Sequence, residues 1–110
     1  LGFPERLEND FPRFNFLDYS NLTFESVNKD VFRSLDLAYK SMEKGGNSPC
    51  VLNAANEIVV DAFLKEKIGF LSMSNIVEVC LEKVTFVKNP TLEDYVSTDK
   101  ETRLLATQLL

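Results

Sequence analysis

The sequence predicts an all-α protein: an antiparallel four-helix bundle preceded by an extended linker with one short strand. From about residue 30 to the end, apolar residues recur every three to four positions, which is the spacing of amphipathic helices. Gly45-Gly46, Gly69 and Asn89-Pro90 divide this region into four segments joined by short loops. Short loops place successive helices antiparallel. We therefore expect residues 30–110 to form the helical domain and residues 1–29 to lead into it.

The first 29 residues have no helical period and contain Pro4 and Pro12. Residues 22–26 (LTFES) alternate apolar and polar side chains, which is typical of a short strand. A flexible tether does not need many aromatic rings, yet this region contains Phe3, Phe11, Phe14, Phe16 and Phe24. We expect an ordered extended linker whose phenylalanines pack on another surface.

The first helix is expected over residues 30–44, with Asn28 or Asp30 as its cap and Gly45-Gly46 as its end. Its core-facing stripe is predicted to contain Val31, Leu35, Ala38 and Met42, with Phe32 and Tyr39 beside it. Lys44-Gly45-Gly46 resembles half of a phosphate-binding loop. It follows a helix instead of a strand and lacks the required spacing, so we interpret it as a helix C-cap.

The second helix is expected over residues 49–67, because Asn47-Ser48-Pro49 supplies a cap followed by proline at the first helical position. The third is expected from Ser72 or Ser74 to residue 83. Its apolar face would consist of Met73, Ile76, Val77, Cys80, Leu81 and Val84.

The fourth helix is expected over residues 91–110, with Thr91 as N-cap and Asp94 at the capping-box position. A second acidic cap at Asp99 is expected to bend or restart it, since Ser97, Thr98 and Asp99 are weak helix formers. We interpret the acidic residues at these helix starts as caps, not as a catalytic pair.

Polar residues interrupt the most apolar helix, VLNAANEIVVDAF at residues 51–63. On a helical wheel one face is expected to be core: Val51, Leu52, Ala55, Ile58, Val59, Ala62 and Phe63. Asn53 and Glu57 fall on the opposite side and Asn56 at the boundary. We predict that these three form a structural hydrogen-bond network with extended backbone or neighbouring helix ends. A ligand or metal role is the alternative, but one carboxylate with two amides is a poor site for Mg²⁺ or Mn²⁺.

Composition excludes several classes of function. Of the 110 residues, 45% are apolar and 26% charged, which is typical of a globular domain. The net charge of −5 argues against nucleic acid or an anionic membrane as partner. The absence of histidine argues against hydrolytic and zinc chemistry. Cys50 and Cys80 are expected to be free thiols. No signal peptide or membrane span is recognisable, so we expect a soluble intracellular protein.

Several motifs in register give the sequence a family resemblance. LNAANE, KIGFLSMSNIVE and PTLEDYVSTDKETR resemble the C-terminal region of the 1-deoxy-D-xylulose 5-phosphate reductoisomerases. LGFPERL, SNLTFES and DVFRSLDLAYKSMEKGG match the preceding segments of that family in the same order. The resemblance spans essentially the whole chain. The first residue is Leu1, not Met, so we expect a piece of a longer protein.

The resemblance implies a role within a larger enzyme. The family converts 1-deoxy-D-xylulose 5-phosphate to 2-C-methyl-D-erythritol 4-phosphate with NADPH and Mg²⁺ or Mn²⁺, in the non-mevalonate isoprenoid pathway. It implies that residues 1–29 are the end of the catalytic domain and a linker, and that residues 30–110 support that domain from outside. Cofactor, metal and catalytic residues would all lie upstream of this chain, which would be inactive alone.

The resemblance also implies the partners and the location. The partners would be the missing N-terminal and catalytic domains of the same polypeptide, in a homodimer located in the bacterial cytoplasm or a plastid-type organelle. A free-standing helical interaction module is the alternative to a support domain. An autonomous enzyme would have to show turnover by the purified chain.

If Asn56 has a structural role, the substitution Asn56→Ala lowers the melting temperature and leaves chemistry unaffected. Thermal denaturation followed by circular dichroism measures this. A ligand that loses affinity while the melting temperature stays constant would show that Asn56 is a binding residue instead.

Overall fold

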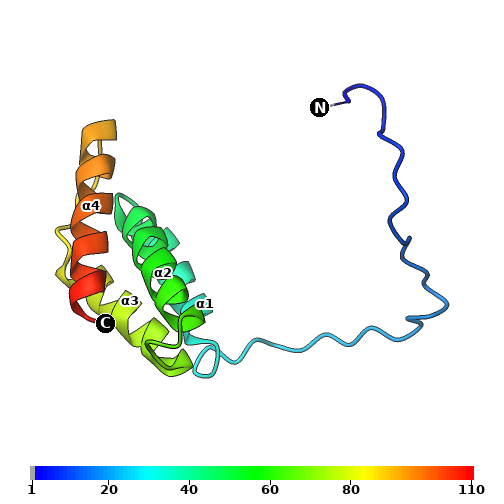
Figure 1. The fold of residues 1–110 in the computed structure, drawn as a ribbon, viewed down its shortest axis with the longest axis horizontal. Helices are drawn as coiled ribbons and strands as arrows, with labels where there is room; N and C mark the ends of the chain where they lie inside the picture. Colours follow the sequence, from blue (N-terminus) through cyan, green and yellow to red (C-terminus); the bar gives the residue numbers. More distant parts are fainter. Residues whose placement is uncertain (1) are drawn as a thin grey trace.

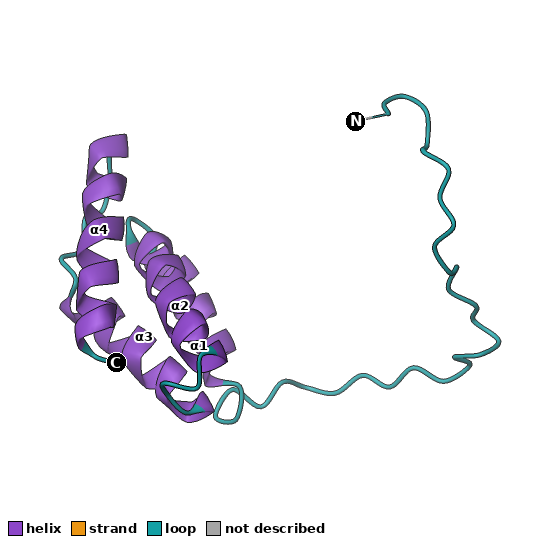
Figure 2. Ribbon diagram, in the orientation of Figure 1, coloured by secondary structure: helices purple, strands orange, loops and turns teal. Residues whose placement is uncertain are grey.

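The computed structural model describes residues 2–110, and this part of the chain contains four α-helices and no strand (Figures 1 and 2). The helices are α1 (Arg33–Lys44), α2 (Ser48–Leu64), α3 (Phe70–Lys83) and α4 (Leu92–Gln108). The all-helical class is therefore confirmed for the described residues. The antiparallel orientation of the bundle stays a prediction.

Residues 2–32 form an extended segment that leaves the helices at the start of α1 and turns back on itself (Figure 1). Every residue in it is exposed, including Phe24 at 88%. The strand expected at residues 22–26 does not form here. A strand needs a neighbour to accept and donate its backbone hydrogen bonds, and no described segment lies beside it. Phe14 packs only on its neighbours Phe16 and Tyr19.

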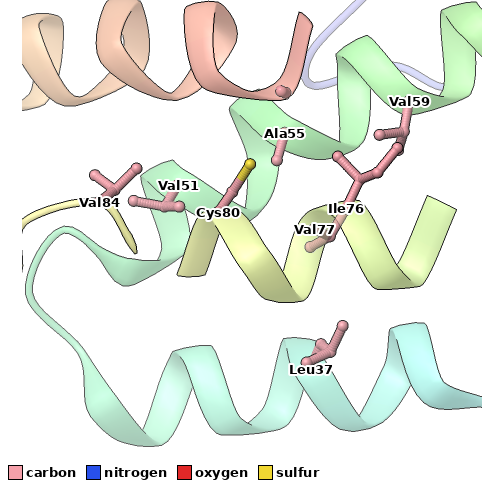
Figure 3. Close-up of a cluster of buried hydrophobic side chains, with 9 residues drawn as sticks. Leu37, Val51, Ala55, Val59, Ile76, Val77, Cys80 and Val84 are labelled. Carbon is pink, nitrogen blue, oxygen red and sulfur yellow. The ribbon is translucent and has the colours of Figure 1, made fainter. Parts of the chain in front are cut away.

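α2 is the central helix, because its contacts with α1, α3 and α4 are more extensive than those of any other helix, and α1 and α4 do not contact each other. The core lies around it, as Figure 3 shows, with Leu37 from α1, Val51, Ala55 and Val59 from α2, and Ile76, Val77 and Cys80 from α3. α4 presents small buried side chains at Thr98, Thr102 and Ala106, one per helical turn. Small residues on α4 and at Ala54 and Ala55 of α2, which have no exposed surface, suit a close approach of these helices.

The predicted core stripe of α1 is wrong. Its buried residues are Leu37 and Ser41, whereas Leu35, Tyr39 and Met42 are 39%, 50% and 73% exposed. Val31 and Phe32 precede the helix and are also exposed. Apolar periodicity identifies the hydrophobic side of a helix but not the element that covers it. Within this chain α1 packs through its other side.

Several predicted helix ends are shifted by local hydrogen bonds. The Asn28 side chain accepts from the backbone N–H groups of Asp30 and Val31, and this separate turn delays α1 to Arg33. α2 ends at Leu64, because Glu66 adopts a left-handed φ of 57° and Lys67 N–H bonds to the Ala62 carbonyl.

The third helix begins before its predicted start, whereas the fourth helix begins with the predicted cap. α3 begins at Phe70 after Gly69, so Ser72 and Ser74 lie inside the helix and do not cap it. The capping box of Thr91 and Asp94 at the start of α4 is confirmed. The restart expected at Asp99 is wrong, because α4 continues without interruption to Gln108.

Asn47 is the most connected polar side chain of the core and is 1% exposed. It occupies the N-cap position of α2 without capping it. Its Nδ2 donates to the Thr85 carbonyl and to Thr98 Oγ1, at 2.9 and 3.0 Å, and its Oδ1 accepts from Val87 N–H at 2.9 Å. One side chain thus joins the start of α2, the α3–α4 connection and α4.

Asn47→Ala removes three hydrogen bonds and leaves buried groups without partners, so we expect it to lower the free energy of unfolding by about 2–4 kcal/mol. Urea denaturation of the chain measures the loss. Asn89→Ala, at an exposed loop position, is the matched control and should change stability by no more than about 0.5 kcal/mol. Equal effects at both positions would contradict the role assigned to Asn47.

Candidate functional site

The candidate site is the outward surface that α1 and α2 share, called here the α1–α2 face. Its residues are Ala38, Pro49, Leu52, Asn53 and Asn56, which line a groove, and the adjoining exposed residues Leu35, Tyr39 and Met42 of α1. Leu35 also lines a second hollow with Phe70 and Leu71 of α3. Between the two helices lies an open groove of about 400 Å³, lined by Ala38, Leu52, Asn53 and Asn56 among others. The surface is mostly apolar, with carboxamides along its α2 margin.

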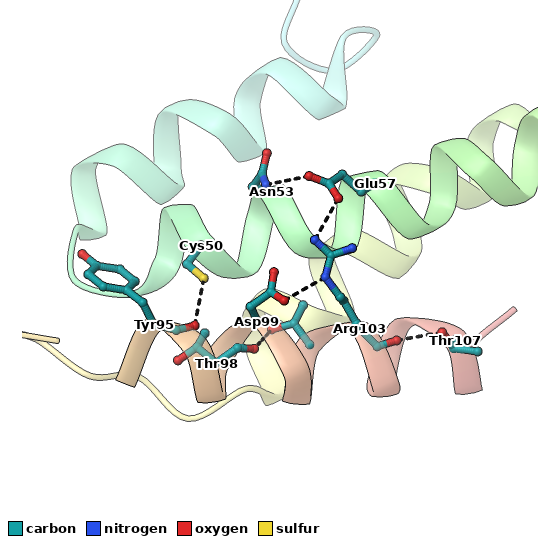
Figure 4. Close-up of polar contacts among 9 residues, drawn as sticks. Cys50, Asn53, Glu57, Tyr95, Thr98, Asp99, Arg103 and Thr107 are labelled. Carbon is teal, nitrogen blue, oxygen red and sulfur yellow. Dashed lines mark hydrogen bonds and ion pairs between the residues drawn. The ribbon is translucent and has the colours of Figure 1, made fainter. Parts of the chain in front are cut away.

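Two of the predicted site residues belong to one hydrogen-bonded chain across α2 and α4 (Figure 4). Asn53 Nδ2 donates to Glu57 Oε1 at 3.0 Å, and the Arg103 guanidinium donates to Glu57 Oε2 at 2.8 Å. Arg103 Nε also donates to Asp99 Oδ2 at 2.8 Å. Arg103 therefore links a carboxylate of each helix, and Asn53 orients one of them.

These hydrogen bonds shift the pKa values of Glu57 and Arg103. The Arg103 guanidinium, and after it the Asn53 amide, hold the pKa of Glu57 below its usual value, since both donate to the ionised carboxylate. Hydrogen bonds to Asp99 and then Glu57 raise the pKa of Arg103. All these groups are partly exposed, so the pairs orient the helices more than they stabilise them.

Asn56 lies outside this network. Its side chain is exposed on the groove and makes no hydrogen bond to any other residue in the range 2–110. The chain itself thus offers no polar contact whose loss would make Asn56→Ala destabilising. A hydrogen-bonding role for Asn56 stays a proposal, and it requires a partner outside the described residues.

The network residues do not suit a cation. Both Glu57 oxygens are already engaged, one of them by a cationic guanidinium that opposes a metal ion. Among the described residues no three His, Cys, Asp or Glu side chains gather closely enough to hold a metal. None of the four described helices is long and apolar enough to cross a membrane.

Cys50 and Cys80 are free thiols in different helices, and burial raises the pKa of both. Cys80 belongs to the core, and Cys50 contacts the Tyr95 carbonyl at 3.6 Å (Figure 4). A raised pKa lowers the thiolate fraction, so neither resembles an activated nucleophile.

Arg103 was not identified from the sequence. Its pairing with Asp99 has a sequence signal, because the two are four positions apart on one helix. Its contact with Glu57 joins residues 46 positions apart and has no such signal. Asn47 was recognised only as a cap, since nothing local indicates that its side chain turns towards α4.

Comparisons with known proteins agree on one family. A sequence model of the family described as "DXP reductoisomerase C-terminal domain" matches residues 1–105. Relatives named 1-deoxy-D-xylulose 5-phosphate reductoisomerase are 51% identical in Phocaeicola vulgatus and 49% in Bacteroides fragilis, each over the whole chain. This chain spans only 29% and 28% of those proteins.

A solved structure gives the same match. It is a 1-deoxy-D-xylulose 5-phosphate reductoisomerase from Zymomonas mobilis in complex with NADPH, with a TM-score of 0.82 and 40% identity. The match covers 98% of this chain and 29% of that one. It therefore includes the extended N-terminal segment as well as the helices.

The Glu57 carboxyl should titrate below the ordinary pKa of glutamate, and Arg103→Met should move its midpoint upwards because the main stabilising donor is lost. Carbon-detected NMR of the side-chain carboxyl measures both midpoints, and Asn53→Ala should give a smaller upward change. Because the folded pKa is depressed, the stabilisation from ionised Glu57 is present above the unfolded pKa and is lost as pH falls through the folded pKa. An unchanged midpoint in Arg103→Met would contradict the assigned cause.

Proposed function

Because the chain belongs to the family of DXP reductoisomerase C-terminal domains, we propose that it supports the catalytic part of such an enzyme. The intact enzyme would convert 1-deoxy-D-xylulose 5-phosphate to 2-C-methyl-D-erythritol 4-phosphate with NADPH. The observation that carries the proposal is that the whole of this chain is similar to part of proteins more than three times its length. The chain alone would be catalytically inactive.

The division of the chain supports this role. Residues 1–29 are the end of the catalytic domain and the linker, and residues 30–110 are the helical support domain. An extended segment with every residue exposed and many aromatic rings buries little by itself, so it is suited to lie on a surface that this chain lacks. The match to a full-length relative across this segment agrees with that role.

The linker has a specific task in this proposal. Residues 22–26 alternate apolar and polar side chains and make no backbone hydrogen bonds within the described chain. They would form a strand by pairing with the edge of a sheet in the upstream part. The strand expected from the sequence would then exist only in the intact protein.

The cofactor and the metal ion would be held upstream, because the residues present do not fit either group. The described chain contains no strand, and so no strand and glycine-rich turn of the kind that binds dinucleotides. Glu57 already pairs with Arg103. The intact enzyme would be a homodimer in the bacterial cytoplasm or a plastid-type organelle.

A free-standing helical interaction module is the second candidate. The observation that favours it is the large apolar α1–α2 face, which a binding module would use for another protein. The open reading frame of the source gene separates the two candidates. An in-frame upstream dinucleotide-binding half supports the enzyme, and its absence supports the module.

The full-length protein should oxidise NADPH in the presence of 1-deoxy-D-xylulose 5-phosphate and Mn²⁺, whereas the purified 110-residue chain should show no rate above background. Absorbance at the nicotinamide band measures both rates. Turnover by the short chain, or none by a folded full-length protein, would contradict the proposal.

A further inference from the structure

We propose that the α1–α2 face is the surface on which the upstream part of the same polypeptide packs. The inference rests on the proposed function, because it requires such an upstream part. It goes further by identifying the helices that form the contact and the chemistry of the contacting surface.

The first argument is the orientation of α1. On a helical wheel, Leu35, Ala38, Tyr39 and Met42 form its apolar side. The three larger residues remain 39%, 50% and 73% exposed. α1 contacts α3 partly through charge, because Arg33 bonds to Asn75 and Glu78. A strongly one-sided helix that turns its apolar side outwards indicates a covering surface elsewhere.

The second argument is the adjoining margin of α2. Asn56 offers two donors and one acceptor and bonds to no described residue, and it lies in the groove beside Leu52. An apolar strip bordered by a free carboxamide suits a surface that combines apolar side chains with backbone N–H and C=O groups.

The third argument concerns the occupant. The matched family is described as a C-terminal domain, and this chain spans only 29% of a relative, so in the proposed enzyme the catalytic part would precede residue 1. α1 directly follows the linker that leads from that part. In Figure 1 the linker leaves the helices beside α1 and curves through the space away from α4.

The charge of the face argues against other occupants. Its eight residues carry no charge, and the charged groups beside it are single ones: the Lys29 ammonium 5.2 Å from the centre of the Tyr39 ring and the Glu57 carboxylate bonded to Asn53. A nucleic acid or an anionic membrane would select basic residues. An uncharged, mostly apolar surface is typical of contacts that are buried permanently.

The test uses the full-length protein with Tyr39→p-benzoylphenylalanine, a photo-reactive residue at a half-exposed position on the α1 part of the face. Irradiation should link position 39 to a peptide upstream of residue 1. ¹⁵N-labelled and unlabelled proteins, expressed separately and mixed under conditions that exchange subunits, should show both linked peptides coming from one chain. Leu104→p-benzoylphenylalanine is the matched control, because Leu104 is 67% exposed on α4, and it should give no upstream link.

Hydroxyl-radical footprinting supplies a second measurement without any substitution. Met42 should be oxidised about tenfold more slowly in the folded full-length protein than after unfolding, since interface cores pack like protein interiors. Oxidation of Met42 at the unfolded rate would overturn the proposal. So would a link from position 39 to another copy, or an upstream link from position 104 alone.

The proposed function is tested separately from the docking surface, because NADPH oxidation by the wild-type protein measures the enzyme activity directly. An upstream link from position 39 in a protein that lacks turnover would retain the docking surface and reject the enzyme activity. Turnover without that link, together with an unprotected Met42, would support the enzyme activity and reject the docking surface.

Discussion

The helical arrangement depends on the hydrogen bonds of one buried amide, Asn47. Its side chain ties the start of α2 to the α3–α4 connection and to Thr98 on α4, and its backbone N–H bonds to the Val87 carbonyl. The preceding Gly46 has a φ of 57° and lies so close to this carbonyl that a Cβ atom would clash with it. A polar group this deep is tolerated only when fully bonded, so it fixes one placement of the surrounding segments.

With the segments placed in this way, α1 buries fewer side chains than α4. α4 reaches the centre of the domain through small side chains, and its buried Thr98 and Thr102 satisfy their hydroxyls through Asn47 and the helix backbone. α1 contributes only Leu37 to the core, together with Ser41, whose buried hydroxyl has no partner among the described residues. Its remaining apolar side is left for another surface. The domain thus has one side whose apolar residues are covered within the chain and one side whose apolar residues remain exposed.

Much of this could be predicted from the sequence where the signal is local. Four helices, the glycine end of α1 and the Thr91–Asp94 capping box all follow from neighbouring residues. Contacts between distant segments could not be predicted, which is why Asn47 was interpreted as a simple cap and Arg103 was missed. The orientation of α1 failed for the same reason. Its periodicity is real, but no described segment covers its apolar side, and none pairs with the strand expected at residues 22–26.

The segment LNAANE shows how six consecutive residues can serve three surfaces. Ala54 and Ala55 have no exposed surface and lie where α2 meets its neighbours, so larger side chains would separate the helices. Asn53 and Glu57 form the link to Arg103 on α4. Leu52 and Asn56 line the groove on the α1–α2 face. Of the polar residues in this apolar helix, Asn53 and Glu57 thus hydrogen-bond towards α4, whereas Asn56 is exposed on the groove.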